Sequence, residues 1–294
     1  MKLNDAPGRA GCWSTGYFRS EELVESTLET FRRASETCYP PPREVLLWGS
    51  TGGGTGSGLG SRLLESLRDC WDGSLEISSV TILPLSCGES ALQVYNTVLA
   101  LAFLHEEGDG SLMHQNRIDL QLKSQNSMIA EAVGSLSLPE NSAGFTGWGD
   151  LRSFVFSGNT KFAQNHFFEN QIDKTVLGSS RGVLACQAMV RGEYNFGASE
   201  ISRLGRPVGW MGDQAFDVVR LKNSRCINKG KKIPSLTLAM NGVDFYKIYI
   251  PKLLQNLEAK IAHRAFLHHF ENDGLSKDSI IQAAEILRGL ADLC

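Results

Sequence analysis

A run of seven glycines in twelve residues, from Gly49 to Gly60, most constrains how this chain folds. Glycine loses more conformational entropy on folding than any other residue, so such a run indicates positive-φ geometry or close approach of the backbone to a ligand. The mostly apolar run Glu44–Trp48 just before it predicts a buried strand, and the leucines after it predict one face of a helix. Backbone N–H groups at such a junction, together with the positive end of the helix, attract an anion such as phosphate.

Two common phosphate-binding patterns do not fit this run. The P-loop pattern G-x-x-x-x-G-K-[ST] needs a lysine, and no lysine occurs between positions 2 and 123. The dinucleotide pattern G-x-G-x-x-G fails from every glycine between Gly52 and Gly58. The remaining pattern is G-G-G-T-G-S-G, in which Thr55 and Ser57 add hydroxyl donors. We therefore expect a triphosphate held by backbone and hydroxyl groups, with a glycine-rich turn that binds nothing as the alternative.

The segments after the glycines predict an α/β fold. A second β-branched, apolar run over Leu75–Leu85 completes a strand–loop–helix–strand unit. Such units build parallel sheets, and their ligands lie at the carboxyl ends of the strands. From Gly144 onward turns around Trp148 and Asp150, followed by short strand-like runs, predict a mixed second region. The residues up to Tyr17 show no period and are expected to form a loop. Helices are predicted over Glu89–Glu106, Asn126–Leu136, Tyr249–Phe270 and Lys277–Leu293, and Phe266 is expected in the core.

The composition is that of a globular, water-soluble protein of 294 residues, with 42% hydrophobic residues and a formal net charge of −3. This charge gives no general attraction to nucleic acid, and the basic patch Lys229–Lys232 is interpreted as a solvated loop, with local nucleic-acid binding as the alternative. Seven scattered cysteines favour reduced thiols inside the cell over disulfides or zinc. Histidines 263, 268 and 269 are interpreted as packing or surface residues rather than a metal site. No apolar run approaches eighteen residues, so we expect no membrane span.

The glycine run resembles the glycine-rich motif of the tubulin family, and six further segments resemble tubulins in the same order along the chain. Two lie upstream, Trp13–Tyr17 and Glu22–Cys38. The four downstream segments are Val94–Asn96, Asp150–Arg152, Val190–Gly192 and Arg264–His268. On these segments, spread over most of its length, the chain is identified as a member of the tubulin family.

The resemblance implies an α/β fold with a three-layer nucleotide-binding domain around a parallel sheet, a mixed α+β intermediate domain and C-terminal helices. The implied domain boundaries are 1–138, 139–245 and 246–294. The first strand of the family and its phosphate loop have no counterpart in this sequence. We therefore expect the nucleotide-binding domain to be incomplete at its N-terminus.

Within the family the chain most resembles delta-tubulin. Gln93 stands where α and β chains carry an acidic residue, and the sequence ends at Cys294 without an acidic tail. The delta class implies a GTP-binding cytoskeletal protein of the cytoplasm that assembles with other tubulins at centrioles, basal bodies and cilia. It implies no nucleic-acid or membrane partner and no disulfides. The epsilon, zeta and other divergent classes are alternatives. A location in the nucleus is a further alternative.

The resemblance places a GTP site on named positions. Glu89 and Gln93 would lie near the ribose, and Asn116 and Asn126 would read the guanine edge, since an amide offers both a donor and an acceptor. GTP is the implied cofactor, and Mg²⁺ is its candidate companion. The residues expected at the phosphates are Gly52, Gly53, Gly54, Thr55, Gly56, Ser57 and Gly58.

Hydrolysis in the family uses a carboxylate that one subunit presents to the nucleotide of its neighbour. Where that acid is expected, three residues after Asp150, this chain has Ser153, and a serine hydroxyl is no general base at neutral pH. We expect weak hydrolysis at most, with Asp150 as the remaining catalytic candidate. Cys12 and Leu122 replace an asparagine and a base-stacking aromatic residue of the family. The alternative is thus a tubulin-like interaction module that no longer binds nucleotide.

Overall fold

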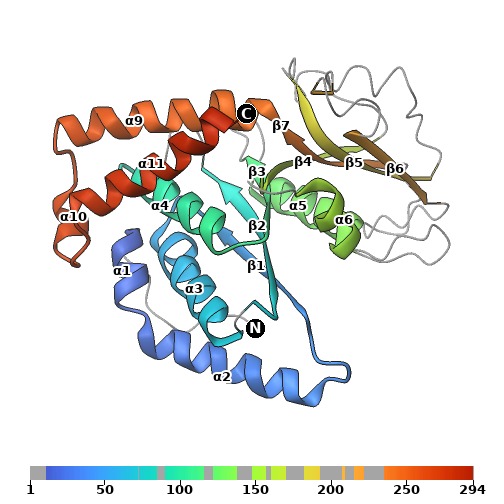
Figure 1. The fold of residues 1–294 in the computed structure, drawn as a ribbon, viewed down its shortest axis with the longest axis horizontal. Coiled ribbons are helices and arrows are strands. Elements are labelled where there is room, and N and C mark those ends of the chain that lie inside the picture. Colours follow the sequence, from blue (N-terminus) through green and yellow to red (C-terminus); the bar gives the residue numbers. More distant parts are fainter. Residues whose placement is uncertain are drawn as a thin grey trace. The chain divides into compact units, whose positions relative to one another are not determined.

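The computed structural model divides into two compact units (Figure 1). Unit 1 combines Met1–Ser111 with Ile250–Leu293, and unit 2 comprises the residues between them, Leu112–Tyr249. The three domain boundaries implied by the resemblance stay predictions. The residues that the structure describes are 11–71, 73–84, 90–115, 122–137, 148–156, 160–169, 182–192, 207–208, 215–221 and 235–293.

Unit 1 contains the strand–helix–strand unit predicted from the sequence. Strand β1 (Glu44–Ser50) runs parallel to β2 (Glu76–Leu83). Between them the chain forms the π-helical turn η1 (Thr55–Leu59) and continues into helix α3 (Gly60–Trp71). Strand β3 (Gly110–Gln115) begins in unit 1, and its residues from Leu112 onward belong to unit 2. The predicted parallel α/β arrangement is confirmed.

Helices surround these strands in unit 1. Helix α2 (Glu21–Thr37) packs on α3, and both cover a buried cluster of leucine and isoleucine side chains that reaches β2. Helix α4 (Gln93–Glu106) is buried along most of its length, because α3 contacts it on one side and α9 (Ile250–Ala262) and α11 (Lys277–Leu293) on the other. The apolar sequence of α4 matches this central position.

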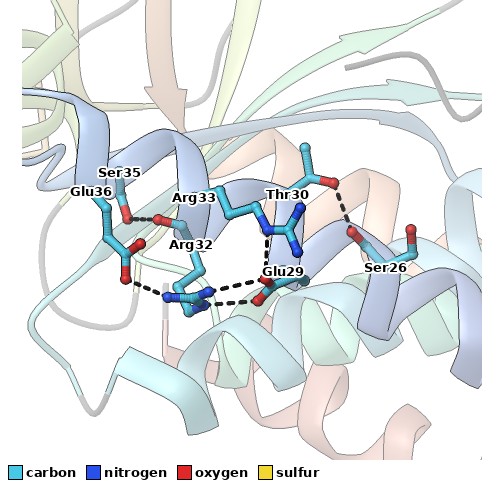
Figure 2. Close-up of polar contacts among 7 residues, drawn as sticks. All are labelled: Ser26, Glu29, Thr30, Arg32, Arg33, Ser35 and Glu36. Carbon is cyan, nitrogen blue, oxygen red and sulfur yellow. Dashed lines mark hydrogen bonds and ion pairs between the residues drawn. The ribbon is translucent and has the colours of Figure 1, made fainter.

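The outer surface of α2 carries a network of charged side chains (Figure 2). Glu29 accepts hydrogen bonds from Arg32 and Arg33, and Arg32 also pairs with Glu36. The hydrogen bonds from Arg32 and then Arg33 lower the pKa of Glu29 to about 2. All four side chains are exposed, so solvent screens these pairs and they contribute little to the stability of the fold.

Three local predictions in unit 1 were wrong. The segment around Trp13 was expected to be a loop, but it forms the short helix α1 (Trp13–Phe18). The helix predicted as far as Phe270 ends at Ala262, and a turn leads into α10 (His268–Glu271). Phe266 was expected in the core, but with a φ of 63° it leaves the helical path and is 42% exposed. Helical periodicity alone cannot reveal such a left-handed residue.

Unit 2 is a mixed α+β region, as the sequence predicted. Its strands lie in the order β4 (Phe162–Glu169), β7 (Ser235–Gly242), β5 (Val183–Arg191) and β6 (Phe216–Leu221). Strand β7 is antiparallel to β4 and β5, whereas β6 is parallel to β5. A buried apolar cluster from these strands forms the core.

Two helices pack on this sheet of unit 2, α5 (Leu122–Ser137) and α6 (Trp148–Val155). The turn that the sequence indicated around Trp148 and Asp150 is thus the start of a helix. The short turn η4 (Phe245–Tyr249) follows β7. Across both units, none of the described helices has the length and apolarity needed to cross a bilayer.

Candidate functional site

The glycine segment, Gly52–Gly58, lies at the carboxyl end of β1 and opens a helix. The Thr51 N–H still donates to the Ile82 carbonyl at 3.1 Å, and the Gly53 carbonyl already accepts from the Ser57 N–H at 3.1 Å. The chain therefore changes from strand to helix within two residues. The first four N–H groups of a helix have no acceptor inside it, so this turn offers donors and a positive dipole end to an anion.

One half of the glycine segment is held by close backbone packing. A Cβ atom on Gly56 would lie 2.2 Å from the Ser50 carbonyl oxygen, and one on Gly58 would lie 2.0 Å from that of Trp13. A Cβ atom on Gly16 of α1 would likewise lie 2.1 Å from the Gly54 carbonyl oxygen. None of the glycines in the segment has a positive φ. Glycine is needed at these positions because the neighbouring backbone leaves no room for a side chain.

The other half of the segment is open. A Cβ atom on Gly53 would meet no atom within 4 Å, and Gly53 and Thr55 are exposed. Of the two hydroxyl groups predicted as donors to phosphate, that of Thr55 lies on an exposed residue. The Ser57 hydroxyl is buried and donates to the Gly53 carbonyl at 2.6 Å, so its hydrogen is already used inside the helix.

Two polar residues of helix α4 contact the chain at the start of the segment. Asn96 is fully buried and donates from Nδ2 to the Gly52 carbonyl at 2.9 Å. The hydroxyl groups of Thr97 and Thr51 lie 3.2 Å apart. Sequence reasoning assigned no role to Asn96, although a signal was present: Asn96 and Thr97 are adjacent polar residues in an otherwise apolar helix.

Helix α1 is fixed on its other side by the turn that precedes α11. The Asp273 carboxylate accepts hydrogen bonds from the hydroxyl groups of Ser14 at 2.9 Å and Thr15 at 2.6 Å, and it pairs with Arg19 at 2.5 Å. Burial raises the pKa of Asp273, but the two hydrogen bonds and the charge of Arg19 outweigh it and hold the pKa below its ordinary value. The glycine segment thus rests on a helix that is itself anchored.

A cavity of about 150 Å³ lies next to the segment, lined by residues of β1, β2, η1, α3 and α4. Its walls combine leucine side chains with the hydroxyl-bearing residues Ser57, Ser61, Ser79 and Thr81. Pockets for drug-sized ligands are typically about 300–1,000 Å³ in volume. The cavity is therefore too small for a whole nucleotide, and the exposed half of the glycine segment is the better candidate for phosphate.

The structure places the other predicted site residues as follows. Gln93 is buried in the first turn of α4, one turn before Thr97, which contacts Thr51 immediately before the segment. Asn126 is exposed on α5 of unit 2. Glu89 and Asn116 lie outside the described residues. The structure thus brings the glycine segment together with the start of α4, while the guanine-reading role of the two asparagines stays a prediction.

The catalytic and metal predictions concern other parts of the chain. Asp150 lies in α6, and the position of its side chain is outside what the structure describes. Ser153 is exposed on the same helix. The basic patch Lys229–Lys232 also lies outside the described residues. In the described part of the chain, no three histidine, cysteine or acidic side chains gather in a way that could hold a metal ion.

The parallel strands and the glycine loop that opens a helix define an α/β protein built around a candidate anion site. Residues 4–120 match the family model described as Tubulin/FtsZ family, GTPase domain. This match and the relatives described next are similarities to the tubulin family, and they support the identification of the chain as a divergent member that the sequence predicted.

The similar proteins include both gamma and delta tubulins. The tubulin gamma chain of Candida glabrata is 32% identical over 142 residues, which cover 44% of this chain and 30% of that protein. The gamma chain of Eremothecium gossypii is 40% identical over 142 residues, with the same shares covered. The tubulin delta chain of Homo sapiens is 29% identical over 149 residues, 46% of this chain and 32% of that protein. The matches thus span about a third of each relative's length.

Proposed function

We propose that this chain binds a guanine nucleotide and that the open half of the glycine segment holds its phosphates. The observation that carries the proposal is the helix start at the carboxyl end of β1, where Gly53 has free space in front of it. An exposed helix start supplies unpaired N–H groups and a favourable dipole for a phosphate. The match to a GTPase domain model supports guanine as the base.

We further propose that the protein is a delta-type tubulin of the cytoplasm that assembles with other tubulins at centrioles, basal bodies and cilia. The family membership and the delta chains among its relatives support this proposal. A tagged copy of the full chain in ciliated cells is expected to concentrate at basal bodies. An even distribution through the cytoplasm would contradict the delta-type role and leave the nucleotide proposal standing.

Hydrolysis is proposed to be weak. Ser153 occupies the position where the resemblance places the activating acid, and its hydroxyl does not act as a base at neutral pH. Phosphate release by the purified chain, alone and mixed with other tubulins, is expected to stay near the background rate. A strong acceleration on mixing, lost in Asp150→Asn, would overturn this proposal and assign the catalytic role to Asp150.

A second candidate function is an interaction module that has lost its nucleotide. The observation that favours it is the Ser57 hydroxyl, which is committed to the Gly53 carbonyl instead of facing the open half of the segment. Backbone N–H groups and the Thr55 hydroxyl would then be the only donors of the predicted set left for phosphate.

Titration of a fluorescent GTP analogue in a buffer with Mg²⁺ separates the two candidates. Saturable binding that unlabelled GTP reverses and ATP does not supports the nucleotide site, and no binding at millimolar analogue supports the interaction module. Gly53→Ala is the site variant, because its methyl group would point into open space and obstruct an approaching phosphate. Gly60→Ala is its matched control, because Gly60 is also open but lies farther along the helix. We expect weaker binding only in Gly53→Ala.

A further inference from the structure

We infer that Asn96 is a positioning residue that fixes the direction in which the first N–H donor of the glycine segment points. Its consequence for nucleotide affinity rests on the proposed function, whereas its consequence for the segment itself does not. Asn96 lies on α4, and it contacts two chain segments that are distant from it in sequence, the entry into α1 and the glycine segment after β1.

All the hydrogen-bonding groups of the Asn96 side chain are used. Its Oδ1 accepts from the Trp13 N–H at 2.8 Å, and its Nδ2 donates to the Gly11 carbonyl at 2.7 Å and to the Gly52 carbonyl at 2.9 Å. A side-chain amide has one acceptor oxygen and two N–H donors, so in the fully buried Asn96 both donors are used and the oxygen has a partner. Only an amide of this length satisfies the three backbone groups together.

The bond to Gly52 has a directional effect on Gly53. In a trans peptide unit the carbonyl and the following N–H lie in one plane and point in opposite directions. Because Asn96 holds the Gly52 carbonyl toward α4, the Gly53 N–H must point away from α4. Gly53 is the exposed residue in front of which the structure leaves open space, so Asn96 directs this donor outward.

Without such a bond this peptide unit would be free to turn. Gly52 and Gly53 have no side chains to restrict their dihedral angles, and glycine adopts positive and negative φ with similar ease. A rotated peptide would present a carbonyl oxygen where an anion needs a donor. The glycine pair gives room for a ligand, and Asn96 removes the conformational freedom that comes with it.

The test compares Asn96→Ser with Asn241→Ser in the full chain. Asn241 is also fully buried and also donates from Nδ2 to two backbone carbonyls, those of Val155 at 3.0 Å and Thr160 at 2.6 Å, but it belongs to unit 2. Hydrogen exchange of the amides in residues 52–58 is measured without nucleotide, at a temperature at which both variants are folded. We expect exchange to be about tenfold faster in Asn96→Ser, because the anchoring hydrogen bonds are lost, and unchanged in Asn241→Ser.

A second variant covers the case in which Asn96→Ser does not fold. Asn96→Asp keeps the shape of the side chain and an acceptor for the Trp13 N–H, but it loses both Nδ2 donors. The same faster exchange in residues 52–58 is expected. A folded Asn96 variant whose segment exchanges at the wild-type rate would overturn the inference.

Nucleotide binding provides the second readout. The fluorescent GTP analogue is expected to bind Asn96→Ser about tenfold more weakly than the wild type. Asn241→Ser should bind the analogue as the wild type does, even if both variants lose the same unfolding free energy. If the wild type binds no analogue, the proposed function fails, and the exchange measurement still decides the role of Asn96. If Asn96→Ser and Asn96→Asp both bind the analogue as tightly as the wild type, the positioning role fails and the proposed function stands.

Discussion

The two halves of the glycine segment use the same residue type for different physical reasons. At Gly56 and Gly58 the backbone of β1 and of α1 lies so close that a methyl group would overlap it. At Gly53 the space is empty and open to solvent. The packed glycines, Gly56 and Gly58, are needed for close backbone packing. The open glycine, Gly53, has no such packing reason, and we propose that it serves a ligand site.

The sharpest test of this difference is Gly58→Ala. A Cβ 2.0 Å from the Trp13 carbonyl oxygen forces α1 or the segment to move, which we expect to cost about 3 kcal/mol of unfolding free energy. Gly53→Ala should change the stability by no more than about 0.5 kcal/mol, because it meets no atom. Urea unfolding of the two variants measures both values. Equal losses of unfolding free energy would contradict the difference between the packed and the open half.

The anchoring of α1 predicts a pH dependence. Because the folded-state pKa of Asp273 is lowered, its ionised form stabilises the fold above the ordinary carboxyl pKa of about 3.9. This contribution is lost as the pH falls through the lowered pKa. Asp273→Asn should lower the unfolding free energy by about 1–2 kcal/mol at pH 7, because the variant lacks the charged acceptor for the hydrogen bonds from Ser14 and Thr15. The difference between variant and wild type should shrink in acid, and a constant difference would contradict the role of the charge.

The smallest expected effect is a gain. Gly60 has helical dihedral angles, φ −61° and ψ −44°, and open space at its Cβ position. Alanine is favoured over glycine inside a helix, so Gly60→Ala should raise the unfolding free energy by about 0.5–1 kcal/mol. Thermal unfolding is a sufficient measurement, and a loss of stability would show that the packed half extends further along the helix.

The main elements were predictable from the sequence because they carry complete local patterns. The apolar run at β1, the glycines and the leucines of α3 specify strand, loop and helix in turn. The helix α1 was not predictable, because six residues are too short to show a helical period. Its stability comes from Asn96 and Asp273, which are distant in sequence.

The candidate site was predictable in its location and only partly in its composition. Glycine spacing marks the segment, but it does not distinguish Gly53, which is open, from Gly58, which is packed. The role of Asn96 depends on three backbone groups that only the folded chain brings together. Phe266 illustrates the same limit, because its position in a helical pattern gave no sign of its positive φ.

The most direct test of the phosphate site is a nuclear magnetic resonance titration of the isotopically labelled chain with GTP, with guanosine as the control. We expect the amide signals of Gly53 and Thr55, two exposed residues of the segment, to shift with GTP and not with guanosine, because phosphate meets the open half of the segment. The signal of Gly58 should shift much less. Unchanged signals across the whole segment at saturating GTP would contradict the proposal that these residues hold a nucleotide.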